Sequence, residues 1–161
     1  MMRSRLLRVV TTIGVLSAVT AAAAVTPTFA EYPAASVFKG TPAAPKLVTP
    51  QARMFRTELR RQAATGPNFA AHFTLALWGC GAGCVYVAVI DAISGDVFFP
   101  SIQFEDKMNA SHGVVCHHAS DFEPTSELFI AQGDLGGKVG RHYFRWQNGR
   151  FTPVHFDRTC L

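Results

Sequence analysis

The segment AHFTLALWGCGAGCVYVAVID, residues 71–91, decides the fold of this chain. Its two ends, residues 71–78 and 84–91, alternate with a period of two and are rich in β-branched and aromatic residues, which is typical of β-strands. The glycine-rich residues 79–83 join these strands as a hairpin. Apolar side chains lie on both faces of the second strand, so we expect it to run through the centre of a sheet.

Further β signals follow this hairpin. Short strands are predicted over residues 97–99, 102–104 and 127–132, and a second hairpin is predicted from residues 141–156 around Asn148-Gly149. An Asn-Gly pair accepts the positive φ values of a type I′ turn, which makes this the strongest turn signal in the chain. Asp91, at the end of its strand, is expected to cap the next turn through the backbone. The chain lacks βαβ alternation, which favours an antiparallel sheet.

One helix is predicted before the strands. Thr49 can cap it, Pro50 fits its first turn, and Gly66-Pro67 ends it. Its apolar residues share one face, and its four arginines, predicted to be a solvated outer face, lie on the other. The fold class we predict is therefore α+β and mainly β: an antiparallel β meander of six or seven strands with one N-terminal amphipathic helix packed on it.

The N-terminus has the pattern of an export signal. Three arginines, an apolar run and the sequence Thr28-Phe29-Ala30 predict a signal peptide over residues 1–30, with small residues at the two positions that signal peptidase reads. A transmembrane anchor is the alternative, but the run is rich in alanine and has no stop-transfer charges after it. We expect an exported mature chain, in the periplasm or outside the cell, with no membrane span.

Removal of this signal changes the charge argument. The signal holds three of the 15 Lys+Arg and none of the 11 Asp+Glu, which leaves 12 basic against 11 acidic residues. This balance gives no reason to expect nucleic acid as a partner. We divide the mature chain into an extended Pro/Ala-rich lead-in over residues 31–48 and a single globular domain over residues 49–161.

Four cysteines remain in the mature chain: Cys80, Cys84, Cys116 and Cys160. An even number in an oxidising compartment favours two disulfides, for which three connectivities are possible. We prefer Cys80–Cys84 with Cys116–Cys160, because the first pair faces each other across the mouth of the hairpin. The alternative is a periplasmic metal-binding or thiol-redox protein that uses Cys80 and Cys84 with a histidine. The β-rich run after Cys84 replaces the helix that a thioredoxin-like centre needs.

Residues 66–97 resemble an uncharacterised family of small secreted bacterial proteins. That family shares a PNFAGHY-like stretch, then WGCG with a nearby cysteine, then an aspartate at a strand end and a TG-type turn; here the chain reads PNFAAHF, WGCGAGC and DAISG. Ala71 stands where the family has glycine, Phe73 where tyrosine is usual and Ser94 where threonine is usual. The resemblance implies a secreted single domain and brings no activity with it.

A histidine-rich stretch is a candidate metal site. Its possible ligands are His112, His117, His118 and Asp121, and imidazoles with a carboxylate can bind zinc or copper. Because no spacing in the stretch is diagnostic, we favour a polar surface loop and expect no cofactor.

The second predicted hairpin offers a candidate binding face. Arg141, Tyr143 and Arg145 fall on one side of its first strand and can contact sugars or a partner protein, whereas the residues between them face the core. No G-x-S-x-G motif or other catalytic set is present, so we lean against an enzyme. The sequence favours a non-enzymatic binding or inhibitor-like module for a protein or cell-envelope glycan, with a cell-envelope hydrolase as a weaker alternative.

Overall fold

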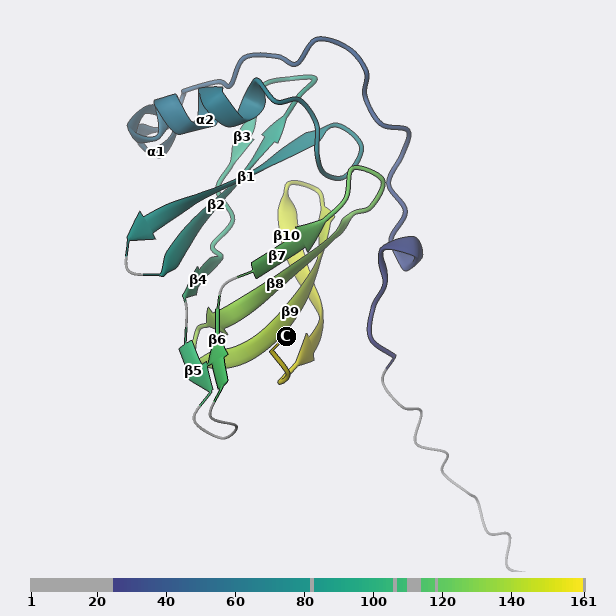
Figure 1. Cartoon of the computed structure of the whole chain (residues 1–161). Helices are drawn as coiled ribbons and strands as arrows, with labels where there is room; N and C mark the ends of the chain where they lie inside the picture. Colours follow the sequence, from purple (N-terminus) through teal and green to yellow (C-terminus); the bar gives the residue numbers. More distant parts are fainter. Residues whose placement is uncertain (1–24, 82, 106, 110–113, 118, 161) are drawn as a thin grey trace, which may run out of the picture.

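The computed structural model describes residues 25–81, 83–105, 107–109, 114–117 and 119–160 (Figure 1). Its helical elements are the 3-10 turn η1 (Phe29–Glu31) and the helices α1 (Pro50–Met54) and α2 (Arg56–Ala63). Its strands are β1 (Phe73–Gly81), β2 (Cys84–Asp91), β3 (Val97–Phe98), β4 (Gln103–Glu105), β5 (Lys107–Asn109), β6 (Val114–Cys116), β7 (Ala119–Phe122), β8 (Leu128–Leu135), β9 (Lys138–Gln147) and β10 (Arg150–Asp157).

Eight of these strands form one antiparallel sheet. Its order is β1-β2-β4-β8-β9-β10, with β3 added to β2 and β7 added to β8, while β5 and β6 pair separately. The mainly β, antiparallel prediction is confirmed, and β2 has neighbours on both edges as expected. The sheet has eight strands rather than six or seven: β4 lies within one residue of the strand predicted over residues 102–104, whereas the four residues of β7 are too few to show a period of two.

The single helix predicted over residues 50–65 is two short helices. Thr49 caps the first through its hydroxyl, which accepts a hydrogen bond from the Ala52 amide (3.0 Å). The helical path is interrupted at Phe55, whose φ and ψ are −97° and 18°. The Phe55 ring packs against the rings of Trp78 and Tyr86, at centroid distances of 5.1 and 5.0 Å, and those two rings also contact each other. This aromatic contact at the break joins α1 and α2 to the outer face of β1 and β2.

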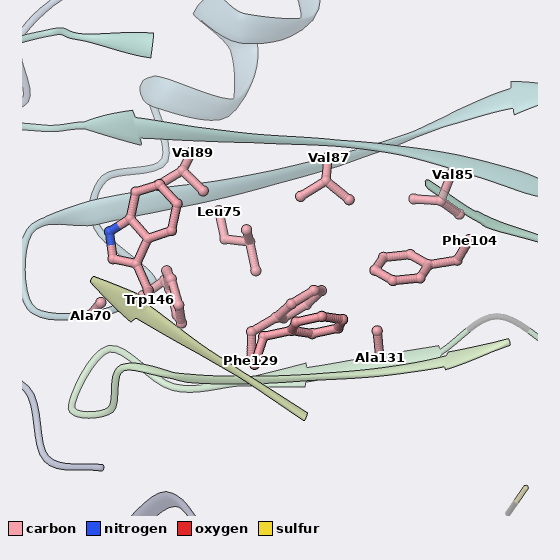
Figure 2. Close-up of a cluster of buried hydrophobic side chains, with 11 residues drawn as sticks. Ala70, Leu75, Val85, Val87, Val89, Phe104, Phe129, Ala131 and Trp146 are labelled. Carbon is pink, nitrogen blue, oxygen red and sulfur yellow. The ribbon is translucent and has the colours of Figure 1, made fainter. Parts of the chain in front are cut away.

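The main core lies between two halves of the folded sheet. Side chains from β1 and β2, including Leu75, Val87 and Val89, face Phe129 and Trp146 from the β8–β10 half (Figure 2). Short β4 connects the halves by pairing with both β2 and β8. The sheet therefore closes over its own apolar side chains.

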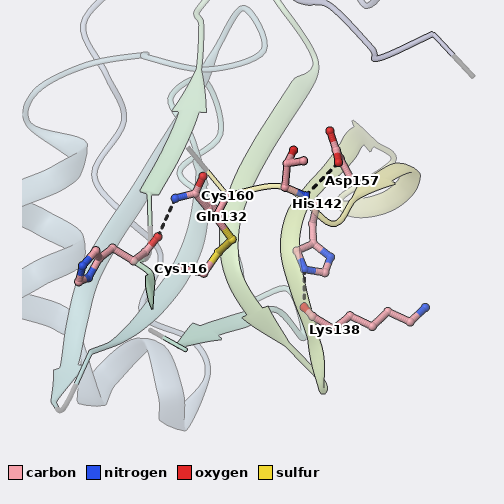
Figure 3. Close-up of a disulfide and its surroundings, with 8 residues drawn as sticks. Cys116, Gln132, Lys138, His142, Asp157 and Cys160 are labelled. Atoms are coloured by element: carbon pink, nitrogen blue, oxygen red, sulfur yellow. Dashed lines mark hydrogen bonds between the residues drawn. A yellow bond between two sulfur atoms is a disulfide. The ribbon is translucent and has the colours of Figure 1, made fainter. Parts of the chain in front are cut away.

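The cysteines pair in the connectivity that the sequence favoured. Cys80 bonds Cys84 within the hairpin, at a Cα–Cα distance of 5.1 Å, and Cys116 bonds Cys160 at 5.5 Å. The second bond fastens the C-terminal end of the chain to β6, beside the Gln132 side chain, which donates to the carbonyl of His117 (Figure 3). Within the described residues, no helix is long and apolar enough to cross a membrane.

Candidate functional site

The N-terminal half of the β1 edge is covered by the chain itself. The Leu75 amide donates to Asn68 Oδ1 (2.7 Å), and Asn68 Nδ2 donates to the Leu75 carbonyl (3.2 Å). This side-chain amide occupies the place of a neighbouring strand, because it supplies one donor and one acceptor to the same residue. Farther along the edge, Gln62 Nε2 donates to the Leu77 carbonyl (3.2 Å). The outward backbone groups of Leu75 and the Leu77 carbonyl therefore all have hydrogen-bond partners.

The edge is open beyond the Leu77 carbonyl. Backbone groups of an antiparallel strand point alternately toward and away from its partner strand. The Leu75 amide and carbonyl point away from β2. The backbone groups of Leu77 and Gly79, two and four residues later, therefore also point away from it; their partners in the β1–β2 register are Val87 and Val85. Among the described residues, no hydrogen bond reaches the Leu77 amide or the outward amide and carbonyl of Gly79. Three backbone groups are thus available to a further strand.

A cavity lies directly beside this open edge. Its volume is about 530 Å³, and its lining includes Leu77, Gly79, Gly81, Val85, Ala119 and Ser120. Leu77 and Val85 belong to the core side of the sheet, and Gly79 is the next position after Leu77 on that side. A Cβ atom built on Gly79 would meet only the Cys84 carbonyl oxygen, at 4.0 Å. The missing side chain of Gly79 therefore leaves part of this space empty.

Cys84, one half of the Cys80–Cys84 disulfide, lies at the rim of the cavity. The β1–β2 pairing shifts its register between Gly79 and Gly81, and Gly81 has a φ of +98°. This irregularity and the short disulfide loop hold the end of the hairpin in place. Gln103 Nε2 lies 3.0 Å from Cys84 Sγ. Both sulfurs are bonded to each other, so neither is a thiolate ligand for copper in this structure.

The predicted metal site is only partly within the described residues. His112 and His118 lie outside them. The Asp121 carboxylate pairs with Arg141 (3.4 Å), and the His117 carbonyl accepts a hydrogen bond from Gln132. In the ranges that the structure describes, no group of three or more potential ligands gathers. A zinc or copper site in this stretch stays a prediction.

The predicted binding face is largely occupied. Tyr143 is only 1% exposed and packs with Leu128 and Ile130, so burial raises the pKa of its hydroxyl and its ring is not at the surface. Arg141 pairs with Asp121, and Arg145 Nε donates to Glu127 Oε2 (2.8 Å). The alternation of faces along β9 is as predicted, but the face that carries Tyr143 is covered. Phe29 and Tyr32, from the N-terminal residues, provide that cover.

The backbone before His72 has an unusual conformation that the sequence does not indicate. Ala70 and Ala71 have φ values of +42° and +71°, a region that favours glycine. His72 follows them, with its Nε2 4.0 Å from Asp91 Oδ2. Asp91 Oδ1 accepts from the amides of Ile93 (2.8 Å) and Ser94 (3.2 Å), which confirms the predicted turn cap. The Asp91 carboxylate therefore caps the turn. Its distance of 4.0 Å from His72 Nε2 is too long for a hydrogen bond, so Asp91 and His72 do not form an acid–base pair.

The chain matches no family model, and comparisons with curated proteins and with solved structures found no match. Its function is therefore inferred from the site itself.

Proposed function

We propose that this protein is an exported, non-enzymatic binding module that takes up an extended peptide segment of another protein at the open end of β1. The observation that carries the proposal is that backbone groups of Leu77 and Gly79, which have no hydrogen-bond partner among the described residues, lie beside an apolar cavity. The two disulfides support a small domain that is stable outside the cell. No metal or cofactor is required for this function.

Strand addition gives a clear division of roles. The backbone of an added peptide would exchange hydrogen bonds with the Leu77 amide and with the amide and carbonyl of Gly79. Alternate side chains of an extended peptide point to the same face, so one of them would enter the cavity. Leu77 and Val85 make that cavity apolar, which favours an aliphatic or aromatic side chain.

The lining argues for a peptide over a glycan. Sugars are bound by stacking on exposed aromatic rings and by several convergent polar side chains. Ser120 is the polar side chain in the lining. Trp78 is also a lining residue, but its ring packs with Phe55 and Tyr86 on the opposite, helix-covered face of the sheet. The cell-envelope glycan that the sequence left open as a partner is therefore the less favoured ligand.

The resemblance to small secreted bacterial proteins agrees with this proposal, since both place the domain outside the cytoplasm. Oxidising conditions keep the Cys80–Cys84 rim closed. A near-neutral mature chain gives no electrostatic reason to bind nucleic acid.

The test is selection from a displayed library of random peptides on the immobilised mature protein, followed by calorimetry with the selected peptide. Gly79→Val fills the cavity without a backbone clash, because the position has open space and no positive φ. The matched control is Ile93→Ser, an exposed change at the opposite end of the β1–β2 hairpin.

We expect the selected peptide to bind the wild type and Ile93→Ser alike, and to lose at least about tenfold in affinity with Gly79→Val. Equal binding by Gly79→Val, with an unchanged thermal transition, would refute the location. Failure to select any peptide would refute the ligand class.

Thiol-redox chemistry at Cys80–Cys84 is the second candidate function, because this disulfide lies at the rim of the cavity. It requires that the bond cycle between reduced and oxidised forms. An insulin-reduction assay with a thiol donor separates the two functions: turnover that is lost in Cys80→Ala/Cys84→Ala supports redox chemistry, and peptide binding without turnover supports the binding module.

A further inference from the structure

The bond at which the sequence predicts removal of the signal peptide lies inside a structured turn. Ala30–Glu31 falls within η1, a single 3-10 turn whose N-cap is Thr28. Glu31 Oε2 accepts from the Thr28 amide (2.7 Å) and hydroxyl (3.0 Å), and the Glu31 amide donates to the Thr28 carbonyl (3.1 Å). These hydrogen bonds hold the pKa of Glu31 below its ordinary value. The residues on both sides of the bond therefore form one local structure.

This turn is packed on the body of the domain. The Phe29 ring lies against the cluster of Leu128, Ile130 and Tyr143 on the outer face of β8 and β9. Ser126 is 1% exposed, and its Oγ lies 3.0 Å from the Phe29 carbonyl oxygen and 2.9 Å from that of Tyr32. The same Oγ accepts from the Leu128 amide (3.1 Å). The turn is thereby tied to the sheet through a buried hydroxyl.

The chain continues this contact after the turn. The Glu127 amide donates to the Tyr32 carbonyl (2.8 Å), and the Ala34 amide donates to the Thr125 carbonyl (2.8 Å). The Arg145 guanidinium lies over the Tyr32 ring, 5.8 Å from its centroid. In Figure 1 the purple N-terminal segment runs alongside the sheet rather than away from it. Cleavage after Ala30 would keep these later contacts and remove Phe29.

The loss of Phe29 would uncover apolar surface. The outer face at Leu128, Ile130 and Tyr143 would lose an aromatic ring, and the Ser126 hydroxyl would lose one of its two carbonyl contacts. Folding therefore favours a mature chain that keeps Thr28 to Glu31.

A second peptidase site precedes the turn. Ala22 and Ala24 place small residues at the two positions that signal peptidase reads, as Thr28 and Ala30 do at the later bond, and Ala21 and Ala23 do the same one bond earlier. The peptidase acts before the chain folds, so packing does not direct the cut. The packing of Phe29 instead indicates which mature chain has the complete fold, namely one that keeps this residue. We propose that the signal peptide is cleaved at the end of this alanine run, after Ala23 or Ala24, so that the mature protein carries the turn as part of its fold.

The direct test is to express the full chain with its own signal in a Gram-negative host and to measure the mature protein by intact mass and N-terminal sequencing. A chain that begins at Ala24 or Val25 is expected. A chain that begins at Glu31, shorter by at least the six residues Val25 to Ala30, would overturn the proposal, as would an uncleaved chain. The assay does not depend on whether any peptide binds at β1.

A stability comparison tests the physical reason. Chains that start at Val25 and at Glu31 are exported behind the same foreign signal, and Phe29→Ser in the longer chain serves as the matched control. We expect the shorter chain and Phe29→Ser to melt several degrees below the longer chain, roughly 5 °C, and to bind more of a hydrophobic dye. Equal melting temperatures for all three would refute the packing argument.

Discussion

Removal of the Cys116–Cys160 bond should lower the free energy of unfolding about twice as much as removal of Cys80–Cys84. The two bonds close segments of very different length, with sequence separations of 44 and 4 residues. A disulfide restricts the unfolded chain, and the restriction grows with the logarithm of the closed segment. The chain-entropy relation then gives about 4 kcal/mol for Cys116–Cys160 and about 2 kcal/mol for Cys80–Cys84.

The burial of the cysteines increases the difference. Cys116 is fully buried, whereas Cys80 and Cys84 are partly exposed. Replacing Cys116 by alanine would therefore also remove buried packing, at about 1 kcal/mol. Cys160→Ala avoids this second effect, because it breaks the bond and leaves the Cys116 sulfur in place.

The assay is equilibrium unfolding in urea, followed by tryptophan fluorescence, since Trp146 is 3% exposed in the main core. The variants are Cys160→Ala and the double change Cys80→Ala/Cys84→Ala. We expect losses of about 4 and about 2 kcal/mol, with unfolding slopes that rise as the unfolded chain expands. A loss in Cys160→Ala equal to or smaller than that in the double variant would refute the reasoning.

Three further changes test the fold. Asn68→Ala should cost about 2 kcal/mol in urea unfolding, because it leaves the buried Leu75 backbone without its side-chain partner; no loss would contradict the edge cover. Gly133→Ala should lower the melting temperature more than Gly136→Ala, although both glycines have positive φ values (+140° and +60°). A Cβ atom at Gly133 would lie 2.8 Å from the Glu105 carbonyl oxygen in β4, whereas one at Gly136 would have no atom within 4 Å. Equal melting temperatures would contradict this. Burial lowers the pKa of His142 in the folded protein below its ordinary value. The free energy of unfolding should therefore fall as the pH drops below the unfolded-state pKa and level off below the folded-state pKa. His142→Gln should flatten this dependence, and an unchanged pH profile of the variant would contradict the reasoning.

The sign of the pH effect follows from the structure. The His142 Nε2–H donates to the Lys138 carbonyl (2.9 Å; Figure 3). The imidazole is buried beside the Phe156 ring. Burial favours the neutral ring in the folded state. In acid the unfolded chain therefore takes up the proton more readily than the folded chain, and the equilibrium shifts toward unfolding. Glutamine can keep the donor to Lys138 without titrating.

Two of the three long hairpins, β1–β2 and β9–β10, could be predicted from the sequence; the third, β8–β9, could not. Residues 71–91 and 141–156 show a period of two, and Asn148-Gly149 marks the turn by its tolerance of positive φ. The short strand β7 could not, because four residues do not establish a period. The break at Phe55 was also beyond the pattern, since it depends on aromatic partners in β1 and β2.

The sites were less predictable than the fold. Alternation along β9 separated Tyr143 from its neighbours, but only the tertiary structure reveals that Phe29 and Tyr32 cover that face. The cavity at Gly79 depends on which face of β1 meets the core and on the distant β7 residues that complete its lining. The glycine-rich residues 79–83 predicted only a turn, whereas the missing side chain of Gly79 also leaves part of the candidate cavity empty.

The most direct test of the peptide-binding account is amide hydrogen exchange of isotope-labelled protein by NMR, with and without the library-selected peptide. The account predicts that the Leu77 and Gly79 amides exchange rapidly in the free protein and become strongly protected in the complex, while the Leu75 amide is protected in both. Unchanged exchange at Leu77 and Gly79 in a peptide-saturated sample, with the peptide-induced shifts centred on another surface, would contradict it.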